Sequence, residues 1–530
     1  MVSDKEEQLT PILKLIRAYQ QPDADFIAQP GEPRIQVSRM ASRMAFVYEK
    51  IRNSLEYQEI HLIRKNAIER IMKRRMLVRI KPSQLAQDLI YELIRARYLP
   101  DNEVPEHKIA DIGIIINKYF YLFNRVSHYL KGKEKRQTYK WLMGIAAVEI
   151  DQALVSPYKT QALAEFMYNT VRPNIVLDEK ASELEKNIQI YLAVQRALLR
   201  SDQAVLRTHL FRYYNQGWYQ ASQEQVEKIA QNLPQIRQTI ETHIRHPMGD
   251  VVFRYLKKYT IYFHVIKDVI AEEPATAESR LGNTETLEVA VKKACYERYN
   301  QAKNKLRRGA VRAIIYIFIT KMMLAIVLEV PYDLYLHSSI QWNPLAVNVI
   351  FHPLLLFLIA LTVRIPAEKN TTLVLEGIKS LLQFHDARDI LMQRVVKRRL
   401  YLTTAFNVIY AITFVITFGA IIYALNRFDF NELSIFLFLL FLTLVSFFGI
   451  KIREDAKEYI VVARRDSTIG FLLDLFSMPI VRAGRWISLR SPKINVFIFI
   501  FDFIIEAPYK TLVNIFDELT KFIKEKKEEL

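Results

Sequence analysis

Polar residues with the potential for chemistry stand inside long apolar runs of this sequence. Lys321 lies near the middle of the run from Val311 to Val330, and Asn348 and His352 lie in the run from Leu345 to Val363. Asn348 and His352 are four residues apart, so they share one face of a helix. Counting about 1.5 Å per residue from the loop between the runs places His352 within about one helical turn of the depth of Lys321.

A third apolar run adds two threonines that are again four residues apart. We predict that the runs bring together one intramembrane polar cluster: Lys321, Asn348, His352, Thr413 and Thr417. A lysine at the centre of a membrane helix costs at least about 2.5 kcal/mol, so it needs a partner or a role. Because we assign the cluster no carboxylate that would complete a proton relay, we interpret it first as hydrogen-bonded contacts between helices. A transport site is the alternative, as is a lysine that reaches towards the membrane surface.

The remainder of the sequence shows no catalytic constellation. Glycine is scarce, at 13 residues, and no glycine-rich phosphate-binding motif is present. The single cysteine, Cys295, excludes an intrachain disulfide and a cysteine-based metal cluster. His243 and His246 share a helix end, with Asp250 following, but no third strong ligand stands at a fixed spacing. We therefore predict no catalytic residue, no metal site and no cofactor.

Four apolar runs organise the chain around this cluster. Each is close to the roughly 20 residues that a helix needs to cross the hydrocarbon core of a bilayer, and the last two contain no charge: Val311–Val330, Leu345–Val363, Tyr401–Leu425 and Leu433–Ile450. The patterns elsewhere are helical, without a convincing strand. The predicted fold is all-α: a polytopic membrane protein with four transmembrane helices and a large N-terminal cytoplasmic helical domain.

The charges of the loops predict the orientation of the spans. Residues 303–312 carry five basic groups, residues 331–344 carry none, residues 364–400 carry eight, and residues 426–432 carry one. Loops rich in Lys and Arg stay in the cytoplasm. We therefore expect both termini in the cytoplasm, with the protein in the plasma membrane or a bacterial inner membrane.

The net charge of +18 has two interpretations. We favour contacts with anionic lipid headgroups, because much of the excess flanks the spans, and we expect no nucleic-acid partner. The candidate headgroup contacts are Arg307, Arg308, Arg312, Lys397, Arg398, Arg399, Lys451 and Arg453.

Linkers and composition predict five regions along the chain. They are a helical subdomain (1–177), a second helical bundle with its linker (178–283), a helical stalk (284–310), the transmembrane domain with a cytoplasmic hairpin at 371–400 (311–466), and an amphipathic tail (467–530). The stalk carries an apolar stripe that would dock within the chain or form a coiled coil with a second copy. In the tail, residues 468–481 and 494–516 would lie on the cytoplasmic membrane surface or against the bundle. Alternatively, residues 494–516 would form a fifth span.

These features favour a membrane-anchored scaffold or adaptor that works in the cytoplasm without catalysis, through a protein partner of unknown identity. The alternative is an oligomeric transporter or channel for an ion or small solute that uses the cluster around Lys321. A membrane-embedded enzyme is a third class, and no motif supports it.

Overall fold

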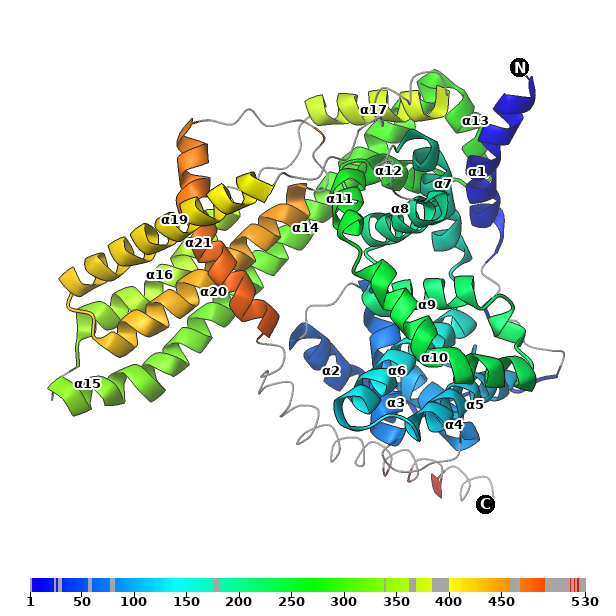
Figure 1. Ribbon diagram of the computed structural model, residues 1–530, viewed down its shortest axis with the longest axis horizontal. Coiled ribbons are helices and arrows are strands. Elements are labelled where there is room, and N and C mark those ends of the chain that lie inside the picture. The colour runs from blue at the N-terminus through cyan, green and yellow to red at the C-terminus, as the bar shows by residue number, and fades with distance from the viewer. Residues whose placement is uncertain are drawn as a thin grey trace. The chain divides into compact units, whose positions relative to one another are not determined.

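The computed structural model of the chain describes residues 2–22, 25–26, 31–55, 60–76, 82–175, 182–337, 340–361, 368–383, 400–457, 461, 468–490, 515, 519 and 522–523. Within these residues the fold is helical, without a β-strand, as Figure 1 shows. Four helices are long and apolar enough to cross a membrane: Thr284–Tyr335, Trp342–Leu361, Thr404–Arg427 and Glu432–Lys451. The predicted all-α membrane fold is confirmed.

The chain divides into two compact units. The first contains residues 1–173 and 179–256, and the second contains residues 257–495. This boundary differs from the predicted linkers near 178 and 283. The reason is that α12 (Thr260–Glu272) and α13 (Ala277–Gly282) pack against the stalk helix that follows them.

The first unit is a bundle of short helices. Its α-helices are α1 (Val2–Gln20), α2 (Arg39–Leu55), α3 (Ile63–Met76), α4 (Pro82–Arg95), α5 (His107–Ser127), α6 (Gly132–Leu154), α7 (Tyr158–Val171), α8 (Glu183–Leu198), α9 (Gln203–Tyr214), α10 (Gln223–Ile244) and α11 (Pro247–Leu256). Apolar residues on α3 to α6 form its main core, with α9 and α10 contributing. The core has its own apolar faces and caps; Ser222 and Gln225, for example, form a capping box at the start of α10.

A buried carboxylate ties together three elements of this core. Glu149 is fully buried and accepts hydrogen bonds from Lys118 Nζ (2.8 Å), the Tyr119 hydroxyl (2.6 Å) and Trp218 Nε1 (2.7 Å). Burial, together with the neighbouring Glu149 carboxylate, raises the pKa of Tyr119 well above its ordinary value. Each oxygen of Glu149 has a donor, so the group stabilises the bundle.

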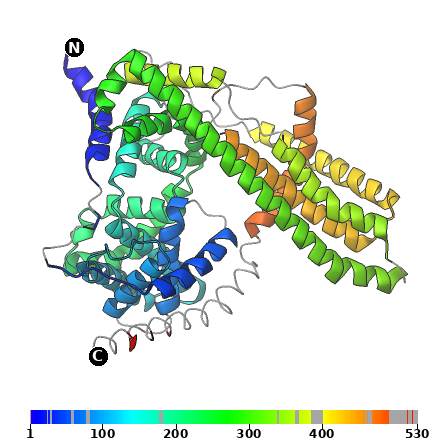
Figure 2. The same cartoon turned by 180° about the vertical axis from the view of Figure 1, so that it is seen from behind.

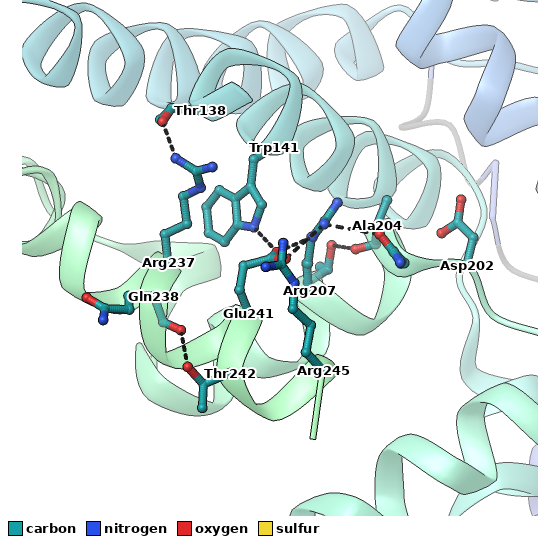
Figure 3. A network of polar contacts seen from close by, with 12 residues as sticks. Thr138, Trp141, Asp202, Ala204, Arg207, Arg237, Gln238, Glu241, Thr242 and Arg245 are labelled. Carbon is teal, nitrogen blue, oxygen red and sulfur yellow. Dashed lines mark hydrogen bonds and ion pairs between the residues drawn. The ribbon is translucent and has the colours of Figure 1, made fainter. Parts of the chain in front are cut away.

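A second carboxylate, Glu241 of α10, joins α6 and α9 (Figure 3). It accepts hydrogen bonds from Trp141 Nε1 at 2.9 Å and Arg207 Nε at 2.6 Å. Burial alone would raise the pKa of Glu241, but the hydrogen bonds and charge of Arg207 outweigh burial and lower it. The polar groups of this network satisfy one another and stabilise the packing of α10.

The second unit contains the stalk and the membrane helices. After α12 and α13 come α14 (Thr284–Leu324), a π-helical turn η4 (Ala325–Glu329), α15 (Val330–His337), α16 (Trp342–Leu361), α17 (Glu368–Gln383), α19 (Leu400–Arg427), α20 (Glu432–Lys457) and α21 (Thr468–Arg490). Helix α14 packs on α16, α16 on α20, and α21 on both α19 and α20. We call the end of this bundle formed by residues 333–337, 340–342 and 427–432 the loop end, and the opposite end, where α14 leaves it, the stalk end.

The stalk and the first span form one continuous helix, as predicted and as Figure 2 shows. Asn283 caps its start by accepting a hydrogen bond from the Glu285 amide at 2.9 Å. Leu287, Val291, Cys295 and Tyr299 of the predicted apolar stripe are buried, and its last two residues, Ala302 and Leu306, are partly buried. This part of α14 packs against α12, α13 and α17 of the same chain.

Asn370 fixes α17 to the stalk. This side chain is 2% exposed, donates to the Tyr299 hydroxyl at 2.7 Å and accepts from the Val461 amide at 2.7 Å. The rest of the predicted hairpin, residues 384–399, lies outside the described residues.

The described part of the tail, α21, packs against the membrane bundle. The Thr417 hydroxyl of α19 donates to the Phe476 carbonyl of α21 at 3.4 Å. Gly484 of α21 crosses α20 so closely that a Cβ there would lie 1.9 Å from the Thr443 carbonyl oxygen. Of the predicted amphipathic segment 494–516, all but Ile515 lies outside the described residues.

Candidate intramembrane site

Lys321 is fully buried at the centre of the first span. The Lys321 ammonium donates a hydrogen bond to Asn348 Oδ1 of α16 and lies 4.6 Å from the centroid of the Phe441 ring of α20. It also lies 3.8 Å from an oxygen of Glu329. The lysine therefore contacts side chains of two neighbouring spans and does not face lipid.

Glu329 supplies the opposite charge. It is 1% exposed, and both of its oxygens accept from Asn348 Nδ2, at 2.8 and 2.9 Å. The Ser434 hydroxyl of α20 donates to Glu329 Oε2 at 3.4 Å. Asn348 thus bridges Lys321 and Glu329, and hydrogen bonds of this kind offset part of the cost of burying two charges.

Sequence reasoning assigned no carboxylate to this cluster, and that assignment is wrong. Glu329 stands within the first apolar run, eight residues after Lys321. On a regular α-helix a spacing of eight turns the second residue about 80° away from the first. The π-helical turn between them contains one extra residue, so the spacing acts like seven and the angle falls to about 20°.

The proline that follows the turn gives a physical reason for it. A proline inside a helix lacks an N–H, and its ring clashes with the carbonyl four residues earlier. Pro331 stands two residues after the end of η4, and the amide of the intervening Val330 donates to the Ala325 carbonyl, five residues back. The wider turn accommodates Pro331 without ending the helix, which continues to His337.

His352 occupies the same layer as Lys321. It is fully buried, with Nδ1 3.1 Å from the Asn348 carbonyl and Nε2 3.0 Å from the Phe438 carbonyl. A neutral imidazole has one N–H, so only the protonated ring donates to both carbonyl oxygens. The ring of Phe438 packs against it with centroids 4.8 Å apart.

A hydrogen-bonded chain continues from this site to the loop end. Asp333, 2% exposed, accepts from the Gln341 amide at 3.1 Å and from the side chain of Asn431. Asn431 in turn accepts from the Ser434 amide at 2.8 Å and so caps α20. Since Ser434 also contacts Glu329, polar groups extend without interruption from Asp333 to Lys321.

The stalk side of the site is apolar. Ile317, four residues before Lys321, packs with Leu356, four residues after His352, and with Val445 of α20. Their side chains are 8%, 0% and 1% exposed. The site is thus polar towards the loop end and covered by an apolar layer towards the stalk end.

The structure separates the two threonines from the predicted cluster. Thr413 donates to the Ile409 carbonyl of its own helix, and Thr417 donates to α21. Counting residues gives the depth of a side chain in the membrane but not which helix lies beside it. Helix α21, which was expected to lie at the surface or against the bundle, takes the place beside α19.

The candidate headgroup contacts fall into two groups. Arg307, Arg308 and Arg312 are exposed on α14 at the stalk end, and Lys451 is partly exposed at the end of the fourth span. Lys397, Arg398 and Arg399 lie outside the described residues, as does the side chain of Arg453.

In the described part of the chain, no three His, Cys, Asp or Glu side chains come together to hold a metal. His243 stacks on Tyr214, and Asp250 pairs with Arg196 at 2.7 Å. Comparison with protein-family models, with curated proteins and with solved structures finds no match.

Proposed function

We propose that this protein moves an ion or a small polar solute across the membrane, through the site formed by Lys321, Glu329, Asn348 and His352. The observation that carries the proposal is the buried Lys321–Glu329 pair, with the ammonium 3.8 Å from the carboxylate. Ionisable residues in the middle of a membrane are costly and usually mark a path for ions or substrates. Uncharged Ser, Thr and Asn side chains join membrane helices without that cost.

The π-helical turn supports the same proposal. Turns of this kind are rare and occur often at functional sites. Here η4 (Ala325–Glu329) brings Glu329 to the face of the helix that carries Lys321. A regular helix would bury the two charges on different faces, so the turn is what makes them a pair.

For the orientation we propose that the stalk end faces the cytoplasm, in a plasma or inner membrane, with both termini on that side. The basic residues near the stalk end support this, because cytoplasmic loops are enriched in Lys and Arg. Arg307, Arg308 and Arg312 would contact anionic lipid headgroups there.

Flux measurements with the purified full-length protein in liposomes test the proposal. We expect wild-type protein to pass at least one of a panel of protons, Na⁺, K⁺ and Cl⁻. Glu329→Gln and Lys321→Met should each abolish that flux, measured on protein that circular dichroism shows to be folded. The matched control is Glu432→Gln, which removes an exposed carboxylate at the loop end. Flux in both site variants equal to that of wild type would contradict a transport role for the pair.

A second candidate, the cytoplasmic scaffold or adaptor, is supported by the first unit. This unit has a large core of its own, and its buried Glu149 and partly buried Glu241 are occupied by neighbouring donors. Such a bundle offers surface for a protein partner or for a second copy. Absence of flux for every ion tested, together with specific capture of a partner from native membranes, would favour this function.

A further inference from the structure

We infer that the species exchanged at this site is a proton, that it enters from the loop end by way of Asp333, and that Ile317, Leu356 and Val445 close the stalk end. This inference rests on the proposed transport function, for which it specifies the substrate and the side of access.

The donors around Glu329 argue against a metal cation as the substrate. Oε1 of Glu329 faces Lys321 and Asn348, and Oε2 faces Asn348 and Ser434. A hard cation requires about six oxygen ligands, whereas this site offers one carboxylate beside an ammonium that repels cations. The same carboxylate repels anions. A proton needs only one acceptor, and both members of the pair titrate.

A balanced proton cycle follows from this pair. It starts with the Glu329 carboxylate and the Lys321 ammonium, whose charges cancel. A proton from the loop end forms an O–H bond on Glu329, and Lys321, now without its counter-charge, releases a proton by breaking an N–H bond. Transfer of the Glu329 proton to the Lys321 amine restores the starting pair. One proton enters and one leaves, and the pair never carries more than one net charge.

The groups that face Glu329 indicate the side of entry. On its own helix they are Lys321 and Asp333, and on the other spans they are Asn348 and Ser434. His352 faces Lys321 instead. Asp333 is the first buried carboxylate met from the loop end, and Glu329 follows about one helical turn deeper. The Asn431 side-chain amide donates to Asp333, and the Ser434 amide donates to Asn431 Oδ1. The Ser434 hydroxyl, which donates to Glu329, is able both to donate and to accept.

The opposite side lacks such a connection among the described residues. Ile317, Leu356 and Val445 pack about one turn towards the stalk from Lys321 and His352. An apolar layer gives a charge no hydrogen-bonding partner and is therefore a barrier. Polar contacts thus connect the site to the loop end. Release of a proton at the stalk end requires this apolar layer to open.

Proton uptake into liposomes that contain a pH indicator, driven by a K⁺ diffusion potential, tests the substrate and the role of Asp333. We expect uptake by wild type, none by Glu329→Gln, and a several-fold slower rate with Asp333→Asn. The matched control is Asp429→Asn, which removes an exposed charge at the same end and should behave as wild type. Asp429 has a φ of 59°, a conformation that asparagine tolerates.

Labelling with a membrane-impermeant thiol reagent tests the side of access. In oriented membranes, Tyr335→Cys marks the loop side and Gly309→Cys the stalk side, since both positions are exposed. We expect Ser434→Cys to react only from the side that labels residue 335. Adding Leu356→Ala should allow reaction from the other side as well. Ser434 is only 2% exposed, so its reaction reports water access along the polar chain, and absence of reaction from either side would overturn access from the loop end. The unmodified chain, with its buried Cys295, gives the background.

The two ideas fail in different ways. If Na⁺, K⁺ or Cl⁻ crosses in a Glu329-dependent manner while protons do not, the proton inference is overturned and the transport proposal stands. If nothing crosses, the transport proposal itself fails. Equal proton rates for the two aspartate variants, or labelling of Ser434→Cys from the stalk side, would also overturn the inference. The labelling requires no change at Asp333, so it decides the side of access even if Asp333→Asn does not fold.

Discussion

Replacing Lys321 with methionine should destabilise the folded protein, because it leaves the Glu329 carboxylate buried without its counter-charge. The ammonium and carboxylate are 3.8 Å apart, and at an effective dielectric constant of about 20 this gives an attraction of about 4 kcal/mol. Removing one partner of a buried pair costs about 3–5 kcal/mol. We therefore expect Lys321→Met to lower the free energy of unfolding by about 3 kcal/mol or more.

A second substitution separates the charge from the packing. In the double variant Lys321→Met with Glu329→Gln, no charge remains uncompensated, and Gln still bonds to Asn348 and Ser434. We expect the double variant to recover at least half of the stability lost in Lys321→Met, since residues in direct contact show non-additive effects.

The assay is denaturant and thermal unfolding of the purified protein in detergent, followed by circular dichroism. Lys305→Met is the control, because Lys305 is exposed on the stalk part of the same helix, and it should change stability little. Additive losses in the double variant would refute the idea that the two charges stabilise each other. Unchanged stability in Lys321→Met would mean that the lysine is not buried.

Three further predictions concern other parts of the chain. Burial, with a contribution from Arg212, lowers the pKa of His209 from 6.5 to about 4, so between these pH values the unfolded chain binds a proton that the folded chain does not. The free energy of unfolding should therefore fall by up to about 3 kcal/mol from pH 6.5 to 4. Denaturant titration at each pH should show a smaller fall in His209→Gln. Gly484→Ala should lower the melting temperature by forcing α21 from α20, whereas Gly309→Ala, with nothing within 4 Å of its Cβ, should not. A reporter active only outside the cytoplasm should work when fused at Trp342 and not at Leu530.

The membrane fold was predictable because length and hydrophobicity decide whether a helix crosses a bilayer. Residues Tyr401–Leu425, for example, lie within α19 (Leu400–Arg427). The predicted first span ends at Val330, which is too early, because a proline such as Pro331 commonly ends a helix. The wider turn before it lets the helix continue.

Part of the candidate site could also be predicted from the sequence. Depth counting placed Lys321, Asn348 and His352 in one layer, and the structure brings these three together. Glu329 and Asp333 could not be aligned with Lys321, because their alignment requires a turn that no simple periodicity contains. Ser434 could not be predicted, because its contact with Glu329 depends on how α20 is placed beside the first span.

The continuous helix α14 has a mechanical consequence. One rod carries both Tyr299, which is held by α17, and Lys321, at a separation of 22 residues or about 33 Å. A helix of this kind transmits rotation and translation along its axis with little loss. Any movement of α12 or α17 would therefore shift or rotate α14 and so displace the Lys321 ammonium inside the bilayer. Any change in the charge of the Lys321–Glu329 pair that moved Lys321 would likewise move the stalk.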